Sequence, residues 1–379
     1  IMVRQCQSNT CPVGVCTQDE KLRAKFTGSA DKVVNLITFY AQEVREILAS
    51  IGARSMDEII GRADLLTQVS RGAANLDDLD LNPMLISVDG ARAITYDRTK
   101  PRNAVPDTLD AEIIKDGHRF FEDGEKMQLS YAVRNTLRTI GTRASSHIVK
   151  KFGMRNALQP DHLTVKLTGS CGQSLGAFSV RGLKLEVQGD ANDYVGKGLS
   201  GGTITVRPLM SSPLKAEENT IIGNTVLYGA TDGFLFASGR AGERFAVRNS
   251  GASVVVEGCG SNGCEYMTGG VAVILGRIGA NFGAGMTGGM AYVYDPDGLA
   301  EDFMNLESIL TCAVGHPHWE MQLKGLIQRH LDETGSRIAE RILSNWDRER
   351  QNFLQVCPKE MLDRLAHPLS DEVAKVPAE

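Results

Sequence analysis

Residues 183–206 read LKLEVQGDANDYVGKGLSGGTITV, in which two apolar runs of strand length flank a glycine-rich stretch. Seven such runs can be aligned through the middle of the chain, and their first residues are 20, 20, 31, 18, 19 and 19 positions apart. The long interval contains PLMSSP at residues 208–213, which indicates an inserted loop. The runs are Leu163–Leu167, Leu183–Val187, Thr203–Val206, Phe234–Ala237, Ala252–Val256, Val271–Leu275 and Met290–Tyr294.

Glycine marks the corners of this repeat. Of the 40 glycines, 27 lie between Gly169 and Gly298, and paired glycines such as Gly201-Gly202 recur in the same register. Glycine allows the positive φ angles of tight corners, and the intervening Val, Ile, Leu and Phe argue against a flexible linker. A fixed period with repeated glycine corners predicts a parallel β-helix, with an antiparallel sandwich as the main alternative.

Composition excludes several classes of protein. With 379 residues, 42% of them hydrophobic, the chain is long enough for two or three folded domains. A formal net charge of -5 argues against a nucleic-acid-binding surface, and no apolar run approaches the ~20 residues that span a bilayer. Eight scattered cysteines do not form a disulfide scaffold, so we expect a reducing, cytoplasmic location.

The first residues carry the strongest indication of chemistry. Cys6, Cys11 and Cys16 are spaced Cys-x4-Cys-x4-Cys, and Pro12 follows the second of them. Thiolates are the ligands of iron–sulfur clusters, and a Cys-Pro step closes ferredoxin-type ligand runs. The spacing matches no common cluster or zinc pattern, so three reduced cysteines on an irregular segment are the alternative. Because the chain opens IMVR without an initiator methionine or a signal peptide, a further ligand is expected upstream.

Helices are predicted on both sides of the repeat. Residues 33–51 keep a helical apolar period that stops at Gly52, and SMDE at 55–58 is a capping box. After the repeat, 321–333 and 337–354 are predicted as a helical pair. A further helix is predicted near 128–151, with a basic docking surface or a solvated face made by Arg134, Arg138, Arg143, Lys150 and Lys151.

No catalytic constellation is evident on the repeat. Cys259 and Cys264 are interpreted as small buried residues at a tight corner, with a metal site as the alternative. His316-Pro317-His318 lacks further metal ligands in the sequence and is interpreted as a surface turn. The repeat itself is therefore predicted to be structural.

Six segments closely resemble the C-terminal part of the large (α) subunit of bacterial glutamate synthase. The resemblance covers essentially the whole chain, which matches about the last quarter of that subunit. The segments are MVRQC at 2–6, SNTCPVGV at 8–15, IGRADLL at 60–66, GDANDYVGKGLSGG at 189–202, IGNTVLYGA at 222–230 and GERFAVRNSG at 242–251.

The resemblance implies a large enzyme that makes L-glutamate from L-glutamine and 2-oxoglutarate with reducing equivalents from NADPH. An upstream amidotransferase domain releases ammonia, and an upstream FMN-binding barrel makes and reduces the 2-imino acid. A [3Fe-4S] cluster beside the flavin receives electrons from a small NADPH-oxidising β subunit, which carries FAD and further Fe-S clusters. The resemblance therefore implies a cytoplasmic hetero-oligomer that binds neither nucleic acid nor membrane.

Carried onto this chain, the family's second and third cluster ligands are Cys6 and Cys11, and the first ligand is expected just upstream of Ile1. Cys16 matches no ligand position, and Gln7 stands where relatives commonly have His. The resemblance places no catalytic or flavin-binding residue in this chain. The fragment is expected to supply cluster ligands and a structural β-helix and to be inactive alone.

The expected fold is mainly β, a right-handed parallel β-helix of about seven coils flanked by α-helical segments. Residues 1–80 are expected to end an FMN-binding synthase domain, a TIM barrel that carries the iron–sulfur ligand loop. Residues 81–125 are a connecting segment, 126–300 the glycine-rich β-helix and 301–379 C-terminal helices. The alternative is a stand-alone β-solenoid scaffold or interaction module, which would have no use for the cysteine segment.

Overall fold

The computed structural model describes residues 11–15, 20–87, 106–153 and 158–370. The chain divides into two compact units. One, the N-terminal unit, comprises Pro12–Val105, and the other, the repeat unit, comprises Ile1–Cys11 with Pro106–Glu379.

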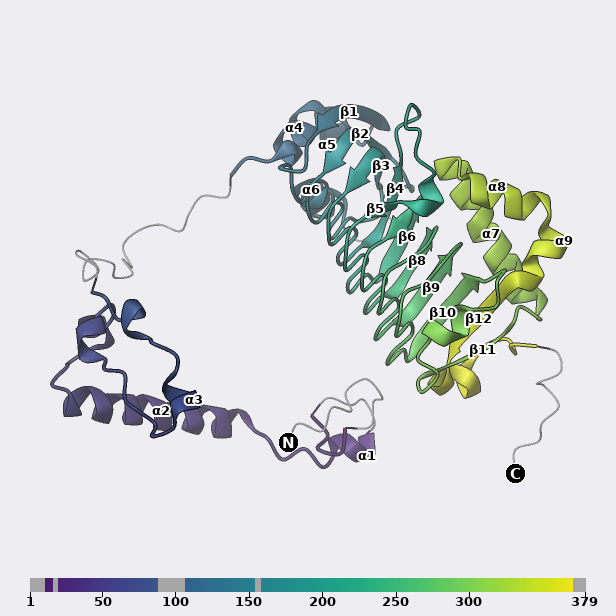
Figure 1. Cartoon of the computed structure of the whole chain (residues 1–379). Helices are drawn as coiled ribbons and strands as arrows, with labels where there is room; N and C mark the ends of the chain where they lie inside the picture. Colours follow the sequence, from purple (N-terminus) through teal and green to yellow (C-terminus); the bar gives the residue numbers. More distant parts are fainter. Residues whose placement is uncertain (1–10, 16–19, 88–105, 154–157, 371–379) are drawn as a thin grey trace, which may run out of the picture. The chain divides into compact units, whose positions relative to one another are not determined.

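The repeat unit is built on a mixed sheet of twelve strands (Figure 1). Eight strands pair in parallel and in chain order, and each predicted apolar run coincides with one of them, apart from Leu275, which follows its strand. The prediction of seven parallel strands is therefore confirmed, and an eighth precedes them. The strands are β1 (Met127–Val133), β2 (Leu163–Cys171), β3 (Leu183–Ala191), β4 (Ser200–Arg207), β6 (Asp232–Ala237), β8 (Ser250–Val256), β9 (Thr268–Ile274) and β10 (Gly288–Tyr294).

Side chains at equivalent positions of the strands form continuous rows. One row, on the face that belongs to the larger core, has no solvent-exposed surface at all. Burying a Val, Leu or Ile side chain contributes about 1.5–3 kcal/mol, so such rows are the main source of stability. This row consists of Val165, Leu185, Ile204, Leu235, Val254, Ala272 and Ala291.

The segments that connect consecutive strands stack as well. In six connections, the first, third and fifth residues of a five-residue stretch have positive φ angles. The amide of Gly196 donates to Leu175 O, that of Leu227 to Val195 O and that of Ala246 to Val226 O, at 2.8, 2.8 and 3.0 Å. Glycine occupies only six of these eighteen positions, because stacked hydrogen bonds hold other residues in the left-handed conformation. The stretches are 174–178, 194–198, 225–229, 244–248, 262–266 and 281–285.

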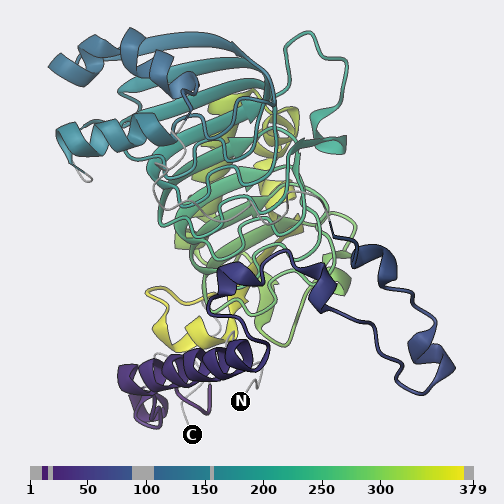
Figure 2. The ribbon, with the colours of Figure 1, turned by 90° about the vertical axis from the view of Figure 1, so that its left-hand side faces the viewer.

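The inserted loop lies between β4 and β5 (Thr220–Ile222) and contains the short helix η6 (Ala216–Glu218). β5 pairs with β3 and with β7 (Arg240–Ala241). The loop projects from the repeat, as predicted for an insertion (Figure 2).

Helices cover the other face of the sheet where its side chains are apolar. One row of side chains on this face changes from polar to apolar along the sheet. Its polar part is Lys166 of β2, Glu186 of β3 and Thr205 of β4, and its apolar part is Phe236 of β6, Val255 of β8, Val273 of β9 and Tyr292 of β10. The apolar part packs under α7 (Pro317–Thr334), α8 (Arg337–Ser344) and α9 (Trp346–Glu349) in a second core.

The predicted helical pair after the repeat is partly wrong. Its first helix is α7, but the second ends at Ser344, and residues 353–358 form strand β12 (Phe353–Pro358). β12 pairs antiparallel with β10 and with β11 (Ile309–Ala313), and it buries Phe353 and Cys357. Pairing with the last sheet strand therefore overrides the helical period. The short helices η7 (Ala300–Phe303), η8 (Arg350–Asn352) and η9 (Lys359–Arg364) lie in the same region.

The predicted helix near 128–151 is wrong in its first part. Residues 127–133 are strand β1, which pairs with β2 along its whole length, and only α6 (Thr142–Phe152) is helical. With α4 (Leu109–Asp116) and α5 (His118–Asp123), α6 lies at the β1 end of the sheet (Figure 1). Side chains of β1 alternate between more and less exposed, which is the period of a strand.

The N-terminal unit contains the predicted helix α2 (Ala30–Ser50), which Ser29 caps and Gly52 follows with φ +74°. The capping-box segment forms the short helix η2 (Met56–Glu58), although Ser55 makes no side-chain cap. The unit also contains α1 (Glu20–Arg23), η3 (Ala63–Leu65), α3 (Ala74–Asp77) and η4 (Asn82–Met84). Within the described residues, no helix is long and apolar enough to cross a membrane.

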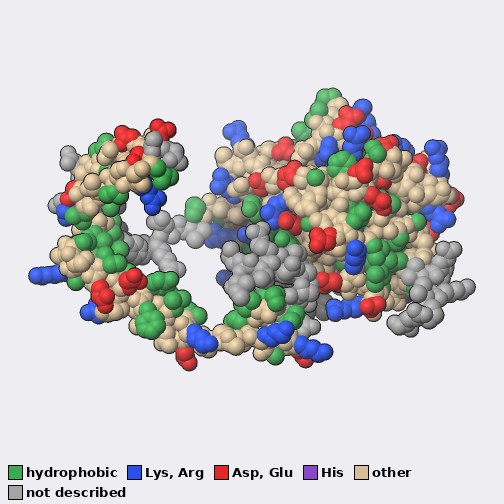
Figure 3. Space-filling view, turned by 60° about the horizontal axis from the view of Figure 1, so that its bottom comes forward, with side chains coloured by type: hydrophobic (Ala, Val, Ile, Leu, Met, Phe, Trp, Pro, Cys, Tyr) green, Lys and Arg blue, Asp and Glu red, His purple; other side chains and the backbone are tan. Residues whose placement is uncertain are grey.

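Apolar side chains of the N-terminal unit lie on its surface (Figure 3). Phe39 is 69% exposed and Ile37 is 60% exposed, and among the described residues of α2 only Leu48 is buried. Most of the larger apolar residues between 65 and 86 are exposed too, with Met84 at 79%. A unit with this little internal core requires another surface to cover it.

Candidate functional site

The predicted cluster ligands fall partly outside the described residues. Cys11 is described and its side chain is buried, whereas Cys6, Gln7 and Cys16 lie outside the described residues. Within the described ranges, no three His, Cys, Asp or Glu side chains gather as a metal-binding group. The described residues alone therefore do not make a complete cluster site, and ligation by Cys6 and Cys11 stays a prediction.

Cys259 and Cys264 lie together in the larger core, both without exposed surface. Burial raises the pKa of Cys259 to about 12 and raises that of Cys264 well above its usual range. No third His, Cys, Asp or Glu side chain among the described residues completes a metal-binding group with them. This environment supports the interpretation of small core residues at a corner.

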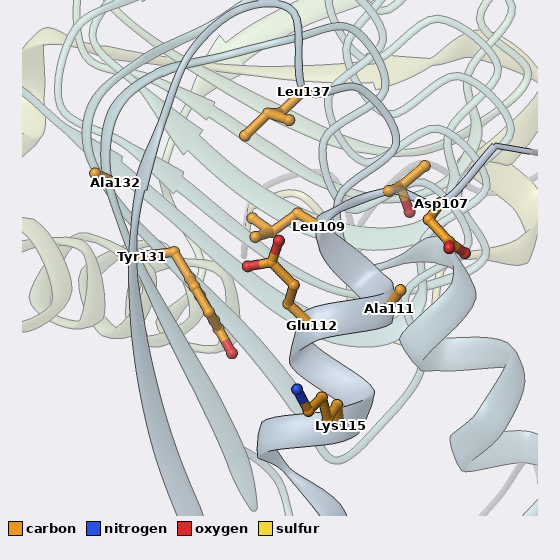
Figure 4. Close-up of a pocket in the computed structure, with 9 residues that line it drawn as sticks. Asp107, Leu109, Ala111, Glu112, Lys115, Tyr131, Ala132 and Leu137 are labelled. Atoms are coloured by element: carbon orange, nitrogen blue, oxygen red, sulfur yellow. The ribbon is translucent and has the colours of Figure 1, made fainter.

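A cavity of about 520 Å³ lies between α4 and the edge strand β1 (Figure 4). Leu109 and Glu112 of α4 lie opposite Tyr131 of β1. The Tyr131 hydroxyl donates to Asp116 Oδ2 at 2.9 Å, and burial and this bond raise the pKa of Tyr131. The cavity thus combines apolar walls with the carboxylates of Asp107 and Glu112, the ammonium of Lys115 and the phenol of Tyr131. Sequence spacing does not reveal it, because its two sides belong to separate elements of the chain.

Asp110 of α4 is fully buried and joins α4 to α6. The amide of Gly141 donates to its Oδ1 at 2.8 Å, and those of Arg143 and Ala144 donate to its Oδ2 at 2.6 and 3.0 Å. Burial raises the pKa of Asp110, and the three backbone bonds oppose that shift. Its carboxylate is placed at the positive end of the α6 dipole, so its role is structural.

A buried polar cluster joins the sheet to α7 and α8. Glu257 Oε1 accepts hydrogen bonds from Ser238 at 3.1 Å and from Ser336 at 2.5 Å, and it lies 3.5 Å from His330 Nε2. All four residues are at least nine-tenths buried. Ser336 also caps α8 by accepting from Ala339 N, so the cluster fixes both helices on the sheet.

Three histidines meet at the beginning of α7. His316 and His318 are joined by His367 from the C-terminal segment, a partner that sequence spacing does not reveal. The rings of His318 and His367 stack with 23° between their planes. Stacked rings direct their nitrogen lone pairs in nearly parallel planes, so the cluster does not converge on one metal position.

The five basic residues near 128–151 are all exposed. Arg143 pairs with the exposed Asp107 at 3.3 Å, a surface contact of small energetic value. Asp190 and Asp193 line a second cavity of about 320 Å³ beside β5, where Asp193 Oδ1 accepts from Asn224 N at 2.8 Å. Both features are compatible with solvated or structural roles.

The stacked connections, with left-handed residues at every second position, define a class of repeat protein. A family model described as "GXGXG motif" matches residues 110–359, and its alternation of glycines has the spacing of the left-handed positions. The chain belongs to this family. A second model, described as "Conserved region in glutamate synthase", matches residues 1–54.

The more particular resemblance is to glutamate synthase. The chain is 66% identical to "Glutamate synthase [NADPH] large chain" of Azospirillum brasilense over 97% of its own length and 24% of that protein. It is 43% identical to the protein of the same name from Bacillus subtilis, over 97% and 24%. It is 46% identical to "Glutamate synthase [NADH]" of Schizosaccharomyces pombe, over 95% and 17%. The predicted resemblance is therefore confirmed, and the chain spans about a quarter of the bacterial large chains.

Proposed function

We propose that the chain is the C-terminal region of a glutamate synthase large subunit, and that the complete protein makes L-glutamate with NADPH as reductant. The observation that carries this proposal is the 66% identity along 97% of the chain. In the proposed reaction, glutamine is hydrolysed to glutamate and ammonia. The ammonia condenses with 2-oxoglutarate to a 2-imino acid with loss of water, and two electrons and the required protons reduce that imine to a second glutamate.

The N-terminal unit is proposed to belong to an FMN-binding barrel domain whose remainder lies elsewhere in the subunit. We assign residues 1–80 to the end of that domain. Of the predicted connecting segment 81–125, the part from Pro106 onward belongs to the repeat unit, whose larger core includes Leu109, Ile113 and Phe120. Support comes from α2, which has apolar residues on most of its surface and buries only Leu48 among its described residues. In water such a helix gains most of its stability from packing against another apolar surface.

Cys6 and Cys11 are proposed as two ligands of a [3Fe-4S] cluster, with the third ligand in the residues before Ile1. Their chemistry fits, because thiolates are the ligands of such clusters. Cys16 is proposed not to ligate. FMN is assigned to the upstream domain, and FAD with further Fe-S clusters to a small β subunit that delivers electrons in a cytoplasmic hetero-oligomer.

Residues 126–300 are proposed to form a right-handed parallel β-helix of about seven coils, followed by a C-terminal region at 301–379 in which α7, α8 and α9 are joined by strands β11 and β12. Parallel pairing of successive strands at a nearly constant spacing supports this, since crossovers within one sheet are right-handed in nearly all proteins. We infer a structural role for it, because its buried carboxylate, Glu257, is engaged in the contacts that hold α7 and α8. A stand-alone scaffold is the second candidate, but the match of residues 1–54 to a glutamate synthase model favours the enzyme.

The test is an assay of the full-length large subunit with its β subunit. We expect oxidation of NADPH that requires both glutamine and 2-oxoglutarate, with two glutamates formed per NADPH. The isolated 379-residue chain should give no turnover under the same conditions. NADPH oxidation without glutamate formation by the complete enzyme, or turnover by the isolated chain, would contradict the proposal.

A further inference from the structure

The three histidines lie where the C-terminal segment crosses the beginning of α7. His316 caps the helix, since its Nδ1 accepts the His318 amide at 3.1 Å. The His367 ring stacks on that of His318 with 3.9 Å between centroids, and its centroid lies 5.4 Å from that of His316. All three side chains are half-buried, so protons from solvent can reach them.

Two further contacts hold the same segment. Trp319 Nε1 donates to the Pro368 carbonyl at 3.0 Å, and Leu369 is buried in the core under α7. Three consecutive residues therefore make these contacts: His367 stacks on His318, Pro368 accepts the hydrogen bond from Trp319, and Leu369 packs in the core. Loosening the stack therefore loosens a segment that closes one side of the second core.

Neutral imidazoles stack favourably, whereas protonated ones repel each other. The nearest carboxylate along α7 is that of Glu320, which already accepts from Trp346 Nε1 and Arg350 Nη1, each at 2.8 Å. On η9, Asp363 and Arg364 are exposed. Burial, then His367, then His316 lower the pKa of His318, and no carboxylate of the described residues is among the causes of this shift.

We propose that residues 365–370 form a proton-sensitive latch on α7, closed while His316, His318 and His367 are neutral and released when they become protonated. A lowered histidine pKa means that the contribution of His318 to stability is present above about pH 6.5 and is lost as the pH falls. The latch is independent of the proposed function.

Hydrogen–deuterium exchange of the full-length large subunit tests the latch. Exchange is measured at about pH 7.5 and pH 5.5, on either side of the ordinary histidine pKa, with labelling times scaled for the intrinsic pH dependence of exchange. We expect the protection of peptides covering 365–370 to fall about fivefold or more at the lower pH. This is the change in an equilibrium constant caused by the repulsion of two like charges about 4 Å apart in water. Peptides from β8 should keep their protection and so exclude global unfolding.

Variants separate the latch from general acid sensitivity. His367→Gln and His318→Gln each remove one charge of the stack and should abolish most of the pH response, while His118→Gln, on the exposed surface of α5, should leave it unchanged. Equal protection of 365–370 at both pH values would overturn the proposal. A full response that persists in both stack variants would overturn it too. If one of the two stack variants, His367→Gln or His318→Gln, has already lost protection of residues 365–370 at pH 7.5, the pH response of the other variant is the test of the proposal.

Discussion

Gly189 of β3 gives the sharpest test of the stacked strands. It has φ +147° and pairs with Gly169 of β2. A Cβ at Gly189 would fall inside the van der Waals distance of the Gly169 carbonyl oxygen and lie 2.7 Å from its carbonyl carbon. Replacement by alanine therefore meets both a backbone conformation reserved for glycine and a clash with rigid backbone.

The cost of Gly189→Ala can be compared with that of a matched variant. Gly229 also has a left-handed backbone, φ +66°, but no atom lies within 4 Å of the position that a Cβ would take there. Gly229→Ala should cost about 1–2 kcal/mol from conformation alone. Gly189→Ala adds the displacement of a strand, with loss of one or two backbone hydrogen bonds at about 1 kcal/mol each, and should cost about 2–4 kcal/mol in total.

Urea unfolding followed by tryptophan fluorescence measures the difference. The chain has two tryptophans, Trp319 and Trp346, and both are buried in the repeat unit, so the signal reports that unit alone. We expect the midpoint of Gly189→Ala to lie well below that of Gly229→Ala at a similar m-value. Equal midpoints for the two variants would refute the stacking geometry described for β2 and β3.

Substitutions at three further positions test other contacts by the same assay. Asp110→Ala removes the acceptor of three amides at the start of α6 and should cost about 3–5 kcal/mol, and Asp110→Asn should recover part of that loss. Glu257→Ala leaves His330 and two hydroxyls buried without their partner and should cost about 3–5 kcal/mol, whereas a loss below about 1 kcal/mol would show that the cluster does not fix α7 and α8. Thr225→Gly relieves a β-branched residue at φ +59° and should stabilise the unit by about 0.5–1 kcal/mol, and a lower midpoint than wild type would contradict this.

Much of the sheet could be predicted because its order is local in sequence. Inward residues such as Leu185 and Ile204 recur at the repeat period, so the strands are visible without knowledge of contacts. The helix predicted over β1 is wrong. Met127, Leu129 and Tyr131 alternate with polar residues, and this is the period of a strand.

Features that depend on distant residues could not be predicted. Glu257 and His330 are in contact although 73 positions separate them in the sequence, and His318 and His367 although 49 do. The spacing of these residues in the sequence therefore does not predict either contact. β12 forms because β10 offers an edge for pairing, which a helical period cannot reveal. Glycine is the residue expected at left-handed positions, but neighbouring hydrogen bonds hold residues such as Thr225 in that conformation.

The proposed cluster is tested most directly by EPR and iron analysis of the full-length large subunit with single cysteine substitutions. Cys6→Ser and Cys11→Ser should each lose the [3Fe-4S] signal and most of the iron, and Cys16→Ser should keep both at the wild-type level. A full-strength signal in Cys11→Ser, or its loss in Cys16→Ser, would contradict the ligand assignment on which the proposed role of the N-terminal segment rests.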